Sequence, residues 1–471
     1  MNKLLDTYLD KRMLFIFLNG MASGFPWVII GSAMTLWLQD AGLTRTAIGF
    51  FGSVFAVYSV NWLWAPLLDR VKIPFLTERF GQRRSWLLLL QSLLFLLIVA
   101  ISFTNPANNL VWVSLLAIGV AVVSSTQDIV IDAYRIDVLD IEEKNKLPAT
   151  AAMATSGWWV GYGFLGAIAL YLSDFGQDWS SVYLIISVFA LGFILNTLWL
   201  DEPESQREVV QGKAQKRYED LLGGRNLFEK LKPVTLVDRI VAIQIVAWQK
   251  TSAWFLSTMV EPLKDFFVRF GKTAIVILLF IMLFKVGEAF LGRMSLVFYK
   301  EIGFTTSEIA TYSKLVGSTL TVIFSIIASM ITVHYGLVRG LMISGVAMAS
   351  TNLIFSYLAF VGPDTTVFAI AILLDNFTAA FSTVAFVAFI SHLTNRAYTA
   401  TQYALMASVG NFGRTLFAGG SGWMVDSLEA QKWVASFGGE WTVFFAITAL
   451  MVIPSLIMLV WISKRFKEIF I

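Results

Sequence analysis

The sequence is short of the residues on which soluble enzymes and metalloproteins depend. Its 471 residues include no cysteine, so disulfide bonds, thiol nucleophiles and cysteine-bound metals are excluded. Only 14% of the residues are charged, whereas a soluble domain carries about 25%. The net charge of +3 is too small to indicate a polyanionic partner. These shortages exclude a soluble enzyme, a disordered chain and a nucleic-acid-binding protein.

Long apolar runs dominate the chain instead. Apolar residues make up 57% of it, with 16 Trp and 39 Phe, and aromatic residues are typical of membrane proteins and their interfaces. A membrane helix needs about 20 mostly apolar residues. The sequence therefore predicts an all-α integral membrane protein with twelve spans. These are residues 13–38, 47–68, 85–103, 110–138, 148–172, 181–200, 272–298, 308–333, 339–361, 366–392, 398–425 and 441–463.

Lysine and arginine are distributed unevenly between the two sides of these spans. If the N-terminus lies in the cytoplasm, the opposite side holds only Arg45, Lys300 and Lys432. Cytoplasmic loops of membrane proteins carry the excess of basic residues. The asymmetry predicts that both termini are cytoplasmic and that the number of spans is even.

The chain also contains an internal duplication. Residues 37–48 resemble residues 298–309, and each segment lies between the first two spans of its half. Six spans followed by six, related as parallel repeats, is the plan of the major facilitator superfamily. We expect a six-helix bundle over residues 1–200, a cytoplasmic linker over 201–271 and a second bundle over 272–471. Within the linker, Leu236–Val260 predicts an amphipathic helix on the cytoplasmic surface.

Ionisable residues inside the spans are the candidates for chemistry, because each costs at least about 2.5–3.5 kcal/mol in hydrocarbon. Five are acids and five are bases, so mutual pairing stays an alternative to function. The fourth, seventh and tenth spans hold eight of the ten, and in the superfamily these spans line the central cavity. The ten are Asp128, Asp132, Arg135, Asp137, Lys285, Glu288, Arg293, Lys314, Asp375 and Arg414.

The fourth span is the richest in these residues. Asp128, Asp132 and Arg135 have spacings that place them on one helical face. Arg135 can neutralise Asp132, which leaves Asp128 as a carboxyl near the midplane that can change between its charged and neutral forms. Such a group is suited to carrying a proton. The alternative is a structural acid paired with Lys285 or Arg414.

The seventh span offers a second pair, Lys285 and Glu288. They can satisfy each other, or Lys285 can meet an anionic substrate group while Glu288 exchanges protons. The first span contains a Gly- and Pro-containing segment, residues 19–26, which predicts either a hinge or close helix packing. Asn19 is expected to offer a further polar contact to substrate. Asp375, Asn376, Asn411 and Arg414 can contact substrate or serve a purely structural role.

The loop after the second span carries a candidate gate. Asp69 and Arg70 are followed by Arg83 and Arg84. An acid at a helix end beside cytoplasmic arginines can latch two halves of a bundle through an ion pair. The ordinary excess of basic residues in cytoplasmic loops explains the arginines equally well.

Several motifs together resemble one family, the AmpG-type muropeptide permeases. The most specific is residues 125–133, STQDIVIDA, followed by residues 137–139. Weaker matches keep their order along the chain at residues 20–26, 63–70, 262–267, 285–290, 382–388 and 400–405. The resemblance implies proton-driven import of N-acetylglucosaminyl-1,6-anhydro-N-acetylmuramyl peptides across a bacterial inner membrane. It ranks Gln127 and Asp128 first as functional residues, followed by Gly24 and Asp132.

Other functions remain open at this point. Related transporters carry acetyl-CoA, so another bulky anion is an alternative substrate. A non-transporting membrane sensor that uses the linker as its readout is a second alternative. An integral-membrane enzyme is disfavoured, because the sequence offers no midplane histidine, cysteine or metal cluster. We expect a monomer without a cofactor, a metal or a nucleic-acid partner.

Overall fold

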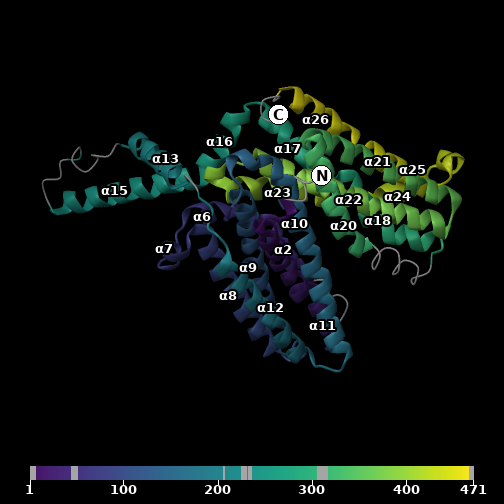
Figure 1. Cartoon of the computed structure of the whole chain (residues 1–471), viewed down its shortest axis with the longest axis horizontal. Coiled ribbons are helices and arrows are strands. Elements are labelled where there is room, and N and C mark those ends of the chain that lie inside the picture. Colours follow the sequence, from purple (N-terminus) through teal and green to yellow (C-terminus); the bar gives the residue numbers. More distant parts are fainter. Residues whose placement is uncertain are drawn as a thin grey trace.

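The computed structural model describes residues 7–43, 51–204, 207–223, 231, 236–304 and 317–465. Every regular element among these residues is a helix. Two bundles meet around α2, α10 and α23 and diverge from there, so that the molecule resembles a V (Figure 1). The loops that carry the duplicated motif, residues 37–48 and 298–309, lie partly outside the described residues, as does Lys314.

The N-terminal bundle contains the helices that precede the linker. They are α2 (Lys11–Trp27), η1 (Val28–Ser32), α3 (Ala33–Asp40), η2 (Gly52–Ala56), α5 (Val57–Val60), η3 (Asn61–Leu63), α6 (Ala65–Arg70), α7 (Leu76–Phe80), α8 (Gln82–Ser102), α9 (Leu110–Asp137), η4 (Ile141–Lys146), α10 (Leu147–Trp159), η5 (Val160–Phe164), α11 (Leu165–Asp174) and α12 (Trp179–Trp199).

The linker and the C-terminal bundle make up the rest. The linker helices are α13 (Arg207–Leu221), α15 (Leu236–Phe255), η6 (Leu256–Val260) and α16 (Glu261–Phe270). The C-terminal bundle contains α17 (Thr273–Leu283), α18 (Val286–Glu301), α20 (Gly317–Tyr335), α21 (Leu337–Val361), α22 (Thr365–Leu393), η8 (Arg396–Tyr398), α23 (Thr399–Ala418), α24 (Ser421–Glu429), η9 (Lys432–Phe437), α25 (Glu440–Leu450) and α26 (Ile453–Arg465).

Helix length and composition agree with a membrane protein. Among the described residues, eight helices are long and apolar enough to cross a membrane, and the apolar helix Thr319–Tyr335 is shorter. The remaining predicted spans, 47–68, 148–172 and 398–425, are largely helical where described. Their helices are interrupted or more polar; residues 398–425, for example, include Gln402, Asn411 and Arg414.

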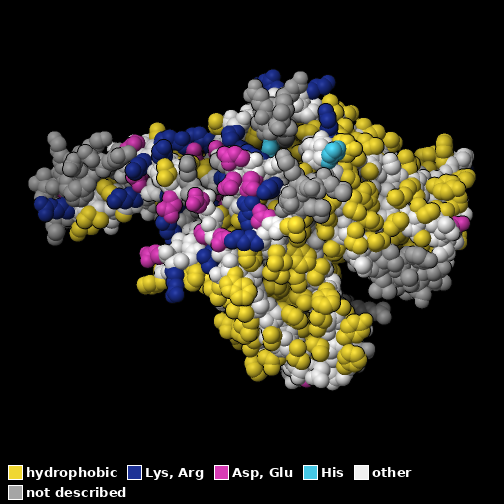
Figure 2. Space-filling view, in the orientation of Figure 1, with side chains coloured by type: hydrophobic (Ala, Val, Ile, Leu, Met, Phe, Trp, Pro, Cys, Tyr) yellow, Lys and Arg dark blue, Asp and Glu magenta, His cyan; other side chains and the backbone are white. Residues whose placement is uncertain are grey.

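The surface separates into an apolar part and a charged part. Hydrophobic side chains cover both bundles, whereas Lys, Arg, Asp and Glu gather around α13 and the adjacent helix ends (Figure 2). We call this charged end of the molecule, where the linker lies, the linker side. Apolar helix faces of this kind are what lipid contact requires, because bilayer hydrocarbon cannot hydrogen-bond polar groups.

The Gly- and Pro-containing segment of the first span packs closely against α10. A Cβ atom on Gly24 would lie 2.2 Å from the carbonyl oxygen of Trp158, and one on Gly157 would lie 2.1 Å from that of Phe17. The helix continues past Pro26 into the π-helical turn Val28–Ser32. Small residues that let two backbones approach are typical of membrane helix interfaces. This geometry supports the packing interpretation of the segment.

The linker is helical where an amphipathic helix is predicted. Residues 236–255 form α15 and 256–260 continue it as a π-helical turn. Ala242, Gln249 and Ala253 are buried, whereas Ile243 and Trp248 are exposed. In Figure 1, α13 and α15 extend together away from the bundles. The position of α15 on a membrane surface stays a prediction.

Candidate functional site

A cavity of about 780 Å³ lies between the two bundles. Both bundles contribute to its lining, as expected for a transporter whose halves enclose the substrate. Its polar and aromatic lining includes Trp27, Phe55, Tyr58, Ser59, Asn61, Asp128, Asp132, Trp158, Glu288, Arg293, Asp375, Tyr403, Ser408, Asn411, Arg414 and Thr415.

The cavity is closed towards the linker side. Its lining follows α23 from Tyr403 to beyond the end of this helix at Gly419. Beyond Tyr403, on the linker side, the bundles contact each other directly. There the buried Arg135 of α9 donates a hydrogen bond to Ser391 Oγ of α22, at 3.2 Å. The cavity therefore lies on the far side of these contacts from the linker.

The two acids of α9 have different partners. Asp132 forms an ion pair of 3.0 Å with Arg135, as the sequence predicts. The guanidinium of Arg135 also lies 5.4 Å from the ring centre of Tyr403. Asp128 accepts a hydrogen bond from Ser23 Oγ at 2.7 Å, and none of the ion pairs found among the described residues includes it. Of the two acids of α9, Asp128 is therefore the one without an ion pair among the described residues.

Lys285 and Glu288 pair with each other. The distance from Lys285 Nζ to a Glu288 carboxylate oxygen is 3.0 Å, and Lys285 also donates to Thr383 Oγ1 at 2.6 Å. Lys285 lies at the interruption between α17 and α18 and is buried, with 4% of its surface exposed. Glu288 lines the cavity and accepts a hydrogen bond from Ser382 Oγ at 3.0 Å. The pair therefore presents its acid, and not its base, to the cavity.

Aromatic rings form one wall of the cavity. Trp27 stacks on Phe55 with ring centres 4.6 Å apart, and Tyr58 and Trp158 lie 5.0 and 5.8 Å from Trp27. All four belong to the N-terminal bundle. The C-terminal bundle contributes two guanidinium groups, Arg293 and Arg414, and the carboxyl groups of Glu288 and Asp375. The aromatic cluster therefore belongs to the N-terminal bundle, which also supplies the carboxyl groups of Asp128 and Asp132, whereas both guanidinium groups come from the C-terminal bundle.

Buried carboxylates hold the bundles together on the linker side. Asp69 of α6 pairs with Arg83 at 2.8 Å and accepts hydrogen bonds from the backbone N–H and hydroxyl of Thr401, at 2.9 and 2.8 Å. Asp137 pairs with Arg83 at 2.9 Å and accepts from Thr399 Oγ1 at 2.6 Å. The two threonines belong to α23 of the other bundle. We call Asp69, Arg83, Asp137, Thr399 and Thr401 the latch.

The linker helix α13 contacts this latch. Arg207 pairs with Asp137 at 2.7 Å. Gln211 Nε2 donates to the carbonyl oxygen of Asp69 at 3.2 Å and to that of Ala397, in the other bundle, at 2.9 Å. Burial, followed by the neighbouring Arg83 guanidinium, lowers the pKa of Arg207. One face of α13 therefore bridges both bundles.

Comparison with known proteins agrees with this architecture. Residues 16–317 match the Major Facilitator Superfamily. A transporter of Rickettsia conorii named AmpG 4 is 33% identical over 97% of each chain. The chain belongs to the AmpG transporters of the major facilitator superfamily. This membership and the fold confirm the family and architecture that the sequence predicts.

Two further known proteins are similar to this chain. The anhydromuropeptide permease of Escherichia coli K12 is 29% identical to this chain, over 97% of this chain and 80% of that protein. A structure of the proton:xylose symporter XylE has a TM-score of 0.64 at 15% identity, covering 98% of this chain and 96% of that one. The likeness to XylE concerns the fold alone.

The structure brings six of the predicted substrate and proton residues to the cavity and leaves five elsewhere. Asp128, Asp132, Glu288, Asp375, Asn411 and Arg414 line it. Gln127 donates to the carbonyl oxygen of Ala22 at 2.8 Å, and Asn19 accepts from Asn196 at 3.1 Å. Asn376 donates to the carbonyl oxygen of Ile372 at 2.8 Å. With Gly24 and Lys285, these residues serve contacts between or within helices.

Only some of the predicted gate residues take part in the contact between the bundles. Asp69 and Arg83 meet in the latch. Arg70 binds Gln215 of α13. Arg84 donates to the carbonyl oxygens of Thr197 and Leu198 at 3.3 and 2.7 Å, at the end of α12 in its own bundle. Its backbone N–H also donates to Glu202 of the linker at 3.0 Å, so none of these contacts joins the two bundles.

Sequence reasoning missed most of the aromatic wall. Trp27, Phe55 and Tyr58 lie in apolar runs, where an aromatic residue facing lipid looks the same as one facing a cavity. Trp158 lies in such a run as well. Arg293 was counted among the ionisable residues of the spans but given no role. It lies five residues from Glu288, a spacing that does not place two side chains on one helix face, so the sequence offered no spacing signal for Arg293.

Proposed function

We propose that the chain is a proton-coupled symporter that imports N-acetylglucosaminyl-1,6-anhydro-N-acetylmuramic acid, with or without its peptide, across the bacterial inner membrane. The name of the Escherichia coli relative supports the substrate class. The observation that carries the proposal is the composition of the cavity, which joins an aromatic wall, two guanidinium groups and an acid without an ion pair in the described chain.

Each wall suits one part of such a substrate. Sugar rings present flat C–H faces that pack on indole and phenyl rings, so the disaccharide is assigned to Trp27, Phe55 and Trp158. Lactyl and peptide carboxylates suit Arg293 and Arg414, because guanidinium groups bind carboxylates through paired hydrogen bonds. The volume of about 780 Å³ lies within the usual range for small-molecule sites.

Proton coupling is assigned to Asp128. With the cavity open, the acid takes up a proton and substrate binds. Excluding water from a charged carboxylate raises the free energy of the closed conformation, and protonation of the carboxylate removes that cost. When the cavity opens on the linker side, the proton leaves and Asp128 regains its charge. Asp132 and Glu288, which already have cationic partners, are assigned to support this exchange.

Alternating access requires the latch to break. If the linker side is cytoplasmic, as the basic residues indicate, this conformation is open to the periplasm. Opening to the cytoplasm must then separate Asp69 from Thr401 and Asp137 from Thr399. The midplane site is fixed while the two bundles rock around it.

The test is uptake of labelled anhydromuropeptide into proteoliposomes with and without an inward proton gradient. We expect accumulation only with the gradient. Asp128→Asn is expected to abolish accumulation while sparing exchange between loaded vesicles, because the neutral amide permits closure but carries no proton. Accumulation by Asp128→Asn at the level of the unchanged protein would clear Asp128 of the role.

The same vesicles test the alternative substrate. Excess unlabelled acetyl-CoA is expected to leave muropeptide uptake unchanged. Gradient-driven uptake of acetyl-CoA without uptake of muropeptide, by protein that elutes as a folded species, would replace the proposed substrate with another bulky anion.

A further inference from the structure

A second cavity, of about 490 Å³, lies between the bundles on the linker side. Ile136, Leu139, Lys144 and Leu147 line it from the N-terminal bundle, and Arg396 and its neighbours line it from the end of α22 and η8. It shares no lining residue with the central cavity. The contact between Arg135 and Ser391 lies beside it. The second cavity is therefore separate from the site assigned to the substrate.

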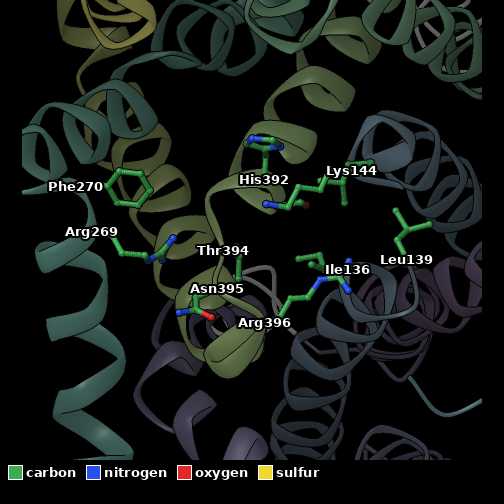
Figure 3. Close-up of a pocket in the computed structure, with 11 residues that line it drawn as sticks. Ile136, Leu139, Lys144, Arg269, Phe270, His392, Thr394, Asn395 and Arg396 are labelled. Atoms are coloured by element: carbon green, nitrogen blue, oxygen red, sulfur yellow. The ribbon is translucent and has the colours of Figure 1, made fainter. Parts of the chain in front are cut away.

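Basic side chains from three elements meet around this cavity. Figure 3 shows Lys144 of η4, Arg269 of α16 and Arg396 of η8 arranged around the same space. Arg269 has a carboxylate partner, Asp265, at 2.9 Å. Lys144 and Arg396 occur in none of the ion pairs found between described residues. Two cations from opposite bundles thus face one cavity without a described counter-charge.

The neighbouring acid does not balance Lys144. Glu143 is bound by Arg12 at 2.7 Å and by Lys146 at 2.6 Å. Burial lowers the pKa of Lys144, and the charges of Arg396 and Arg269 lower it further. These like charges repel one another across the boundary between the bundles, and an anion placed between them would remove that repulsion.

Apolar side chains complete the lining. Ile136 and Leu139 lie at the linker-side end of α9, and Leu147 and Phe270 are buried beside them. The cavity therefore combines basic groups with apolar surface at the level where the spans end. A phosphate with attached hydrocarbon fits both features better than a free ion does. Arginine and lysine are the usual partners of phosphate oxygens.

We propose that this cavity binds a phosphate anion, supplied by the headgroup of an anionic phospholipid, which joins Lys144 of one bundle to Arg396 of the other. The acyl chains then contact Ile136, Leu139 and Phe270. Because the anion contacts both bundles only while the linker side is closed, its binding stabilises that conformation. Binding can be measured without transport, so this proposal and the proposed function fail independently.

The test is the thermal stability of the purified full-length protein with short-chain phosphatidylglycerol. We expect a saturable rise in melting temperature. The double variant Lys144→Gln, Arg396→Gln is expected to raise the half-saturating concentration about 30-fold, the size expected for two basic residues that face an anionic lipid. The variant Lys144→Arg is expected to keep the response, because it retains the charge.

The matched control is the double variant Lys264→Gln, Arg339→Gln, which removes two cations of the linker side that do not line the cavity. It is expected to respond as the unchanged protein does. An identical response from the cavity variant, or no response of the unchanged protein to the lipid, would overturn the proposal.

Two further measurements identify the source of the phosphate and guard against a misfolded variant. Inorganic phosphate at equal concentration is expected to give little effect; a full effect would overturn the assignment to lipid. Photoactivatable phosphatidylglycerol added to the unchanged protein is expected to label peptides that contain residues 136–147 or 391–396. Labelling confined to other peptides would reject the site.

Discussion

At the scale of residues, Asp128 and Asp132 show how one helix face holds two acids in different states of pairing. The ion pair between Asp132 and Arg135 measures 3.0 Å, and Arg135 is fully buried. Removing one partner of a buried pair costs about 3–5 kcal/mol because it leaves the other charge uncompensated. Asp132 has 32% of its side chain exposed, which reduces the expected cost to about 1–3 kcal/mol.

We therefore predict that Asp132→Asn lowers the melting temperature of the detergent-solubilised protein clearly, whereas Asp128→Asn lowers it little. Asp128 has a hydroxyl partner, Ser23, that an amide oxygen can keep. A larger loss of stability in the Asp128 variant than in the Asp132 variant would contradict this difference in pairing.

A second prediction at this scale concerns pH. Hydrogen bonds from Arg12 hold the pKa of Glu143 well below its usual range. Stability from Glu143 is therefore present in full above the unfolded pKa of about 4.3 and declines as the pH falls below it. The melting temperature of Glu143→Gln should fall short of the unchanged protein at pH 7, with a smaller gap at about pH 3.5.

The neighbouring exposed acid supplies the control. Glu142→Gln removes a charge from the same short helix, η4, without removing a partner of Arg12. It should leave the melting temperature nearly unchanged at both pH values. A gap for Glu143→Gln that widened towards acid would contradict the prediction.

At the scale of elements, α2 and α10 cross so closely that adding a single methyl group to the first span is expected to disturb their packing. A Cβ at Gly24 would lie 2.2 Å from the backbone of Trp158, which cannot move aside as a side chain can. Gly24→Ala is expected to destabilise the protein by about 1–3 kcal/mol, the usual cost of overpacking. Gly163→Ala is the matched control, because a Cβ there meets nothing within 4 Å. Equal melting temperatures of the two variants would refute the close-packing account.

The elements also show what the sequence could predict. Apolar length located the spans, and the cost of burying charge directed attention to the helices that line the cavity. The direction in which each side chain points is harder to predict from the sequence. Gln127 is next to Asp128 in sequence, but it turns towards the backbone of Ala22. Lys285 lies at a helix interruption, so it points to Thr383 and not to the cavity. Neither direction follows from spacing along an unbroken helix.

At the scale of the whole molecule, the latch joins the two bundles on the linker side of the cavity. Asp69→Asn removes the ion pair with Arg83 and weakens the hydrogen bonds from Thr401. We predict that the variant populates conformations with the linker side open. Because the chain has no cysteine, spin labels on Glu142→Cys and Arg339→Cys can report the distance between the bundles there.

The unchanged protein should give a short, narrow distance distribution and Asp69→Asn a longer, broader one. Glu78→Gln removes an exposed acid of the same side and should behave as the unchanged protein does. A distribution in Asp69→Asn that matches that of the control would show that Asp69 does not determine closure.

The whole-molecule arrangement was only partly open to sequence reasoning. Two matched halves and charged residues in the fourth, seventh and tenth spans predicted a shared central cavity. The linker was assigned a place but no partners, because composition does not reveal which helix face meets which bundle. The bridge made by Gln211 depends on two backbone carbonyls, and these carry no signature in sequence.

If transport requires the bundles to separate on the linker side, we expect this bridge to make the linker a point of control remote from the substrate. Arg207, Gln211 and Tyr218 of α13 face inward, while Val209, Lys213 and Lys216 remain accessible. An antibody fragment that binds both the accessible face of α13 and the adjoining bundle would prevent α13 from moving away from the bundles. Such a reagent would arrest the transport cycle non-competitively, and raising the muropeptide concentration would not relieve the block.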